Sequence, residues 1–180
     1  MQERYLKKVV DFKRSKIDEH DLRGVVLAYS DTLTLLNVLD DDFYFNGFTV
    51  FRNSDVTHCK AYDDKDHFVN RALRLKSEKP QRKPKVDLTD WKALLISAQA
   101  LFPLITIHQE AIANQVCYIG RLTSMTEKMF SMYEINTNAE WDRTYRRKLI
   151  DLTRVDFGGG YEDALWRVAE EDDLIPKIII

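Results

Sequence analysis

Two stretches of this chain decide the fold because they repeat one another. Residues 24–57 read GVVLAYSDTLTLLNVLDDDFYFNGFTVFRNSDVT, and residues 120–153 read GRLTSMTEKMFSMYEINTNAEWDRTYRRKLIDLT. With a shift of 96 residues, from Gly24 to Gly120, they align without a gap over 34 positions, with 3 identities and 12 similar pairs. Because turn positions and apolar positions agree together, we interpret the alignment as an internal duplication.

Each copy has the composition of a short series of β-strands. In the first copy, β-branched and apolar residues in 24–29 and 32–39 flank a turn at Ser30-Asp31. Asn46-Gly47 then predicts a hairpin turn, because both residues tolerate the positive φ of a type I′ turn. In the second copy the predicted strands are 116–124, 129–135, 145–149 and 153–157. A tight turn before the last strand completes the order of a small five-stranded barrel of the Sm-like or SH3-like kind.

Two short segments carry a resemblance to known proteins. Residues 152–165, LTRVDFGGGYEDAL, and residues 47–57, GFTVFRNSDVT, resemble parts of uncharacterised bacterial proteins with Sm-like barrels. The resemblance covers roughly residues 20–60 and 115–170. It implies a fold and no activity, and it carries over no catalytic residue.

Helical patterns fill the rest of the chain. Apolar spacing predicts helices over 3–14, from Asp66 to about residue 75, from Asp87 or Thr89 to Pro103, and over 161–171. We therefore expect an α+β fold of two tandem Sm-like or SH3-like barrels with flanking helices, packed as one body. The expected divisions are 1–76 with the first barrel, a basic proline-containing linker at 77–86, and 87–180 with the second barrel.

Composition excludes several classes of protein. With 180 residues and 44% hydrophobic content, the chain can bury a core and is not intrinsically disordered. A net charge of −2 argues against a dedicated DNA-binding protein. No apolar stretch reaches the ~20 residues of a bilayer helix, and no secretory signal is visible. We therefore expect a cytoplasmic protein without a membrane partner, in which Cys59 and Cys117 are free thiols.

No familiar catalytic pattern is present. Gly158-Gly159-Gly160 precedes a helix, but the Lys-Ser/Thr pair of a phosphate-binding loop does not follow it. His58, Cys59 and His67 are the nearest approach to a metal or nucleophile cluster, and their spacing fits neither. We therefore predict no catalytic residue, no cofactor, no bound metal and no enzymatic activity.

Charged clusters are the candidate partner surfaces. Residues 71–85 carry seven Lys and Arg against Glu78 alone, a net charge of +6. The candidate phosphate or partner contacts are Arg82, Lys83 and Lys85 in this run and Arg143, Arg146 and Arg147 in the second copy. Asp40, Asp41 and Asp42 form a candidate acidic partner face.

The function that we expect is a non-enzymatic protein-interaction module, because no catalytic constellation is visible in a fold type that more often binds than reacts. Two alternatives remain open. One is an Sm-like RNA-binding regulator that uses the basic clusters. The other is a bacterial immunity or antitoxin protein in which the aspartates of 40–42 cover a basic toxin surface. The sequence predicts neither the partner's identity nor the oligomeric state.

Overall fold

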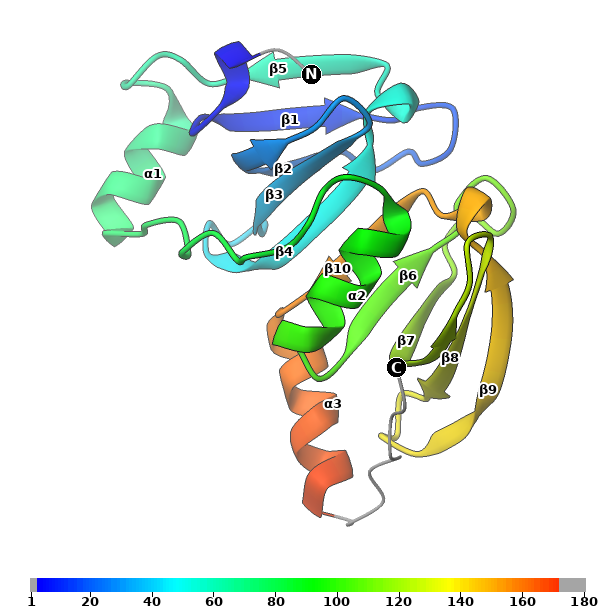
Figure 1. Cartoon of the computed structure of the whole chain (residues 1–180). Helices are drawn as coiled ribbons and strands as arrows, with labels where there is room; N and C mark the ends of the chain where they lie inside the picture. Colours follow the sequence, from blue (N-terminus) through cyan, green and yellow to red (C-terminus); the bar gives the residue numbers. More distant parts are fainter. Residues whose placement is uncertain (1–2, 172–180) are drawn as a thin grey trace.

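A computed structural model describes residues 3–171, which form one ten-stranded antiparallel sheet with three α-helices (Figure 1). The sheet order is β5-β1-β2-β3-β4-β10-β6-β7-β8-β9. The strands are β1 Val9–Lys13, β2 Leu22–Tyr29, β3 Leu33–Leu39, β4 Phe45–Arg52, β5 His58–Ala61, β6 Ile105–His108, β7 Cys117–Met125, β8 Met129–Ile135, β9 Trp141–Lys148 and β10 Arg154–Phe157. The helices are α1 Phe68–Lys76, α2 Trp91–Leu101 and α3 Gly160–Glu171, with 3-10 turns η1 Glu3–Tyr5, η2 Asn53–Asp55 and η3 Leu149–Asp151.

The elements recur after 96 residues. β3, β4, η2 and β5 have counterparts β8, β9, η3 and β10 whose first and last residues lie 96 positions later. Local irregularities recur as well, because Phe43 and Ala139 both adopt positive φ, at 62° and 61°. A Cβ added to Gly24 or to Gly120 would lie 2.1 Å from a backbone oxygen of the neighbouring strand in either case. We call β1–β5 with α1 the first unit, and β6–β10 with α3 the second unit.

The predicted pair of closed barrels is wrong, because the strands form a single open sheet. β4 does not turn back onto β5 of its own unit; it pairs with β10 of the other unit, with Val50 opposite Val155 and Phe48 opposite Phe157. This pairing satisfies the backbone groups of two strand edges at once, so neither unit needs to close. Within the described residues, β5 and β9 are left as the two edges of the sheet.

The predicted helix over 3–14 is also wrong. Only η1 is helical there, and Val9–Lys13 forms β1 between β2 and β5. Val9, Val10 and Phe12 are spaced acceptably for a helix, but β-branched residues favour a strand that is paired on both sides. The equivalent strand β6, which follows Pro103 closely, was not predicted.

Asn46-Gly47 does not form the predicted hairpin turn, because both residues lie inside β4. The chain turns at residues 40–44, where Asp40 Oδ1 accepts from the Tyr44 amide at 2.8 Å. Gly47, with φ 71°, packs so closely on the glycine segment before α3 that an added Cβ would lie 2.6 Å from the Gly159 nitrogen. Asn46 Oδ1 accepts from the Gly160 amide at 2.8 Å at the start of α3. The two glycine-containing segments therefore serve one contact between the units.

The helices cover the sheet at three places. Figure 1 shows α2 across the middle, with α1 beside the first unit and α3 beside the second. Val69 of α1 and Leu165 of α3, which are 96 residues apart, each pack into a cluster with their own unit's strands. The central cluster, under α2, includes Leu94, Leu95, Ala98, Val50, Ile107 and Val155. Within residues 3–171, no helix is long and apolar enough to cross a membrane.

Candidate functional site

A buried group of charged side chains lies where the units meet. This joint cluster consists of Arg14, Asp18, His108, Glu110, Arg154 and Asp156. Arg14 is fully buried, and its two terminal nitrogens donate to Glu110 Oε2 at 2.5 Å and Oε1 at 2.8 Å. Arg14 Nη2 also donates to Asp18 at 3.0 Å, and Arg154 Nη1 lies 3.2 Å from Glu110. The ion pair between Arg14 and Glu110 therefore connects the first unit to the second.

Asp156 is the anionic end of the joint cluster. His108 Nε2 lies 2.8 Å from Asp156 Oδ2, and Thr49 Oγ1 donates to Asp156 Oδ1 at 2.5 Å. Burial by itself raises the pKa of Asp156, but the charge of Arg154, with smaller contributions from His108 and Thr49, holds it well below its usual range. Asp156 is therefore a permanent carboxylate at neutral pH.

Cys117 brings a thiol close to this histidine and carboxylate, since it lies directly opposite His108 in the β6–β7 pairing. Both residues line a cavity of about 370 Å³. However, burial raises the pKa of the Cys117 thiol, and the nearby Asp156 carboxylate raises it further. His108 Nε2 faces Asp156, while Arg154 Nη2 lies 3.3 Å from Nδ1 and 3.0 Å from Nε2. With its nitrogens engaged in this way, His108 is not placed to act as a base toward the thiol.

Two clefts flank Trp91, the first residue of α2. The larger, of about 540 Å³, is the second-unit cleft, and the smaller, of about 340 Å³, is the first-unit cleft. The second-unit cleft is lined by Asp90, Trp91, Lys92, Glu127, Lys128, Met129, Lys148, Leu149 and Ile150. The first-unit cleft is lined by Asp31, Thr32, Leu33, Arg52, Ser54, Thr89, Asp90, Trp91 and Ile150. Asp90, Trp91 and Ile150 line both clefts.

The two clefts are copies of one feature. Each is built from the turn between the second and third strands of its unit and from the 3-10 turn that follows the fourth strand. Glu127, Lys128, Met129, Lys148 and Ile150 lie 96 residues after Asp31, Thr32, Leu33, Arg52 and Ser54. The duplication therefore places a cleft on either side of one indole ring.

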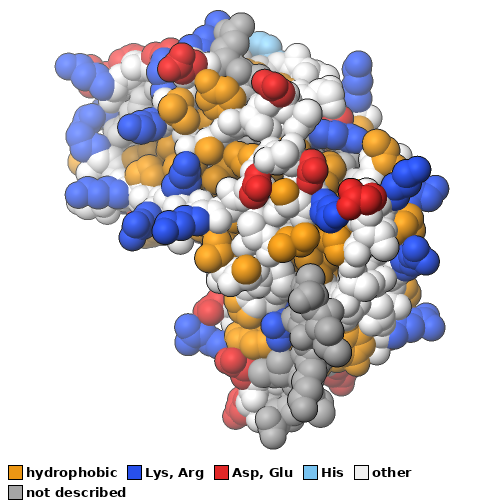
Figure 2. Space-filling view, viewed as in Figure 1, with side chains coloured by type: hydrophobic (Ala, Val, Ile, Leu, Met, Phe, Trp, Pro, Cys, Tyr) orange, Lys and Arg blue, Asp and Glu red, His pale blue; other side chains and the backbone are white. Residues whose placement is uncertain are grey.

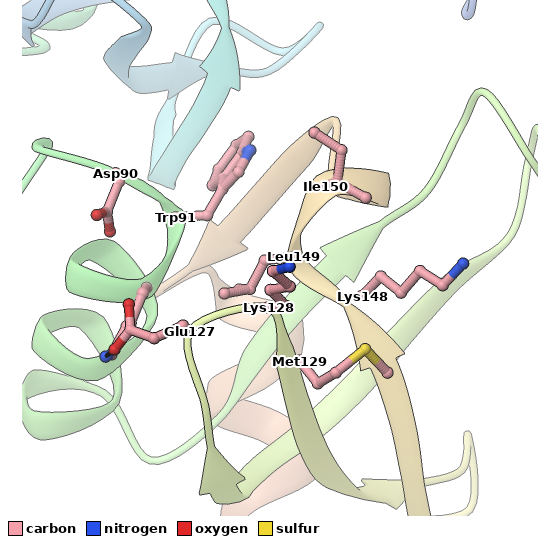
Figure 3. A pocket seen from close by; sticks show the side chains of 9 residues that line it. Asp90, Trp91, Glu127, Lys128, Met129, Lys148, Leu149 and Ile150 are labelled. Atoms are coloured by element: carbon pink, nitrogen blue, oxygen red, sulfur yellow. Dashed lines mark hydrogen bonds and ion pairs between the residues drawn. The ribbon is translucent and has the colours of Figure 1, made fainter.

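Local hydrogen bonds hold the clefts in shape. Asp90 Oδ1 accepts from the Ala93 amide at 2.8 Å and caps α2, which fixes Trp91 at its first turn. The Leu149 amide donates to the Lys128 carbonyl at 3.0 Å, so η3 is tied to the turn before β8. Figure 3 shows Trp91 and Ile150 rising from α2 and η3 on either side of the second-unit cleft.

The lining of the second-unit cleft is apolar with mixed charge. Ile150 is 73% exposed, so its side chain is accessible to a ligand of the cleft. Lys92 pairs with Glu127 at the rim. The remaining charges on this cleft are Asp90, Lys128 and Lys148.

The predicted basic residues fall into two separate places. Figure 2 shows Lys and Arg side chains gathered over α1 and the start of the following segment, and a second group over β9. Arg82, Lys83 and Lys85 are exposed, and within the described part of the chain none of them forms an ion pair. Arg143, Arg146 and Arg147 lie on β9, where Arg147 pairs with Glu134 and Arg143 Nε donates to the Tyr145 hydroxyl.

The other predicted residues also have definite places. Asp40 forms the β3–β4 turn, whereas Asp41 and Asp42 at its tip are exposed. His67 caps α1, where its Nδ1 accepts from the Val69 amide at 3.3 Å. Among residues 3–171, no group of three or more His, Cys, Asp or Glu side chains is placed to hold a metal ion.

Sequence reasoning missed both the joint cluster and the clefts. The clefts had a signal, since the turns that build them, at Asp31-Thr32 and Glu127-Lys128, occupy equivalent positions of the duplication. The joint cluster matches no local motif: Arg14 and Glu110 are equivalent positions of the duplication, but they and Arg154 come from three distant segments. No protein-family model, curated protein or solved structure matches this chain.

Proposed function

We propose that this protein is a non-enzymatic binding protein that holds a segment of a partner protein in the paired clefts beside Trp91. The observation that carries this proposal is the duplication of the cleft on both sides of one aromatic side chain. Two adjacent clefts of the same construction suit an extended chain, which can place one side chain in each.

The chemistry of the lining favours protein over nucleic acid. Trp91, Met129, Leu149 and Ile150 offer apolar contact, and aromatic and methionine side chains are enriched in protein interfaces. The surrounding charges have both signs, whereas a nucleic-acid surface would need an excess of cations. An apolar anchor with a mixed polar rim is the usual anatomy of a protein-binding patch.

A displayed library of random linear peptides tests this proposal. We expect selection on the full chain to enrich peptides that share apolar residues at a fixed spacing. Ile150→Asp should abolish the binding of these peptides, because it puts a charge between the two clefts. Since Ile150 is 73% exposed, this change should leave the fold intact, which circular dichroism would verify.

Ile112→Asp is the matched control. Ile112 is 67% exposed and lines neither cleft, so the selected peptides should bind this variant as they bind the original protein. Failure to enrich any peptide, or enrichment of peptides that bind Ile150→Asp unchanged, would show that the clefts are not the binding site.

A further inference from the structure

The segment that joins the units carries a concentration of positive charge. We call the exposed cations of α1 and the linker the basic strip: Arg71, Arg74, Lys76, Lys79, Arg82, Lys83 and Lys85. Within the described residues none of them lies within ion-pair distance of a carboxylate; Glu78 is the acid within this run, and Asp41 and Asp42 lie on the turn beside Tyr44. Glu162 and Asp163 of α3 line a cavity with Gln81, but Glu162 accepts a hydrogen bond from Thr106 and Asp163 pairs with Arg167. Acids more than about 8–10 Å away are largely screened at physiological salt.

The linker part of the strip is held in place. Gln81 lies between the strip's cations. Its backbone N–H donates to Asn37 Oδ1 at 2.7 Å, and its side-chain Oε1 accepts from Asn37 Nδ2 at 2.8 Å. Asn37 is fully buried in β3. Further along, Val86 and Leu88 pack against the central core. Lys79, Arg82, Lys83 and Lys85 are therefore presented from a fixed backbone, which lowers the entropy lost on binding.

Aromatic rings lie at the α1 end of the strip. Tyr44 is 49% exposed, and Lys76 Nζ lies 3.7 Å from the centre of its ring. Phe68, which is also exposed, packs edge-on against Phe43. Cations interleaved with exposed aromatic rings are the combination that binds phosphates and stacks unpaired bases.

The β9 cluster also has arginines beside aromatic rings, but it offers fewer unpaired cations than the basic strip. Arg147 is neutralised by Glu134 and lies over the Tyr118 ring at 3.9 Å, and Arg143 is bonded to Tyr145. Arg143 and Arg146 are the exposed arginines on that strand without an ion partner among the described residues, against seven such cations in the basic strip. The structure thus separates two clusters that look alike in the sequence.

We infer that the basic strip binds single-stranded nucleic acid, at a site distinct from the clefts beside Trp91. Phosphates would lie along Lys79, Arg82, Lys83 and Lys85, and a base would stack on Tyr44. If four cations neutralise phosphates, the logarithm of affinity falls with the logarithm of salt with a slope of about −3. The affinity then drops about 50-fold between roughly 50 and 200 mM salt.

Fluorescence anisotropy, which measures the affinity of the full chain for a labelled oligouridine of 15 nucleotides, tests this inference. Arg82→Glu with Lys83→Glu should weaken binding at least about tenfold at ~50 mM salt and flatten the salt dependence by about 1.5 in slope. Arg143→Glu with Arg146→Glu makes the same change of charge on β9 and should leave binding within about twofold. Equal losses in both double variants, or no binding to the original protein, would overturn the inference.

A labelled polyglutamate of 15 residues separates nucleic acid from acidic protein. Stacking on Tyr44 predicts that oligouridine binds more tightly than polyglutamate and that Tyr44→Leu reduces its affinity about tenfold with the salt slope unchanged. Tighter binding of polyglutamate would instead assign the strip to an acidic protein partner and would refute the proposed ligand.

Discussion

Glu110→Gln should strongly destabilise the protein, because it removes one charge from a buried ion pair. The side chains of Arg14 and Glu110 are 0% and 4% exposed, so the Arg14 guanidinium has no access to compensating water. Removing one partner of such a pair costs about 3–5 kcal/mol. Asp18 remains 3.0 Å from Arg14 and offsets part of the loss, so we expect about 3 kcal/mol.

Urea unfolding followed by circular dichroism measures this cost. In thermal unfolding, a loss of about 3 kcal/mol corresponds to a fall of roughly 6–12 °C in Tm for a chain of this size. Salt at 0.5 M should change the difference little, because buried pairs are poorly screened. The double variant Arg14→Met with Glu110→Leu should recover much of the stability, since replacing both charges leaves neither unpaired.

Glu127→Gln is the control for this prediction. It makes the same substitution in the Lys92–Glu127 pair, where Glu127 is 84% exposed, and it should not change stability measurably. A loss below about 1 kcal/mol in Glu110→Gln would refute the view that the joint cluster fixes one unit to the other.

Three further outcomes follow from the structure. Asp156 has a lowered pKa in the folded state, so its contribution to stability is complete above the unfolded pKa of about 4 and is lost as the pH falls below that value. Asp156→Asn should therefore flatten the decline in unfolding free energy below about pH 4. An unchanged acid profile would contradict this. Gly47→Ala should lower the free energy of unfolding in urea by about 1–3 kcal/mol, because the φ of Gly47 is positive and the added Cβ would meet Gly159. Gly160→Ala, the control, should be tolerated, and equal effects of the two changes would contradict the close contact. Asn37→Ala removes the side-chain bonds to Gln81, so trypsin should cleave the 79–85 segment faster, and an unchanged cleavage rate would show that this anchor does not hold the linker.

The duplication could be predicted from the sequence because it rests on local patterns. Both copies have strand composition here: the structure gives Met129–Ile135 its predicted bounds, and it begins Leu33–Leu39 one residue after the predicted start at 32. The helices α2 and α3 were predicted within a few residues, since polar residues 87–89 and Pro103 bracket one and the glycine run precedes the other; the cap of α2 is Asp90 and not the predicted Asp87 or Thr89. Signals of this kind require only neighbouring residues.

The arrangement of the units could not be predicted in the same way. Whether β4 closes on β5 or joins β10 depends on competition between two edges, and no residue of β4 encodes the choice alone. Asn46-Gly47 was misleading because the positive φ of Gly47 serves a contact with Gly159, a residue more than 100 positions away. Arg14 and Glu110 occupy equivalent positions 96 residues apart, but each follows a strand that the sequence did not reveal, so their pairing was not predicted.

The edge strands β5 and β9 oppose extension of the sheet by further molecules of this protein. If β5 of another molecule aligned on β9 as β10 aligns on β4, the 96-residue equivalence would put His58 opposite Arg147 and Lys60 opposite Tyr145. The apolar pairs that join the units would be replaced by Cys59 with Arg146 and by small or polar neighbours. Positive charge on a strand edge discourages such pairing. A designer who wished to turn this tandem into a fibre would have to begin by neutralising the outer arginines.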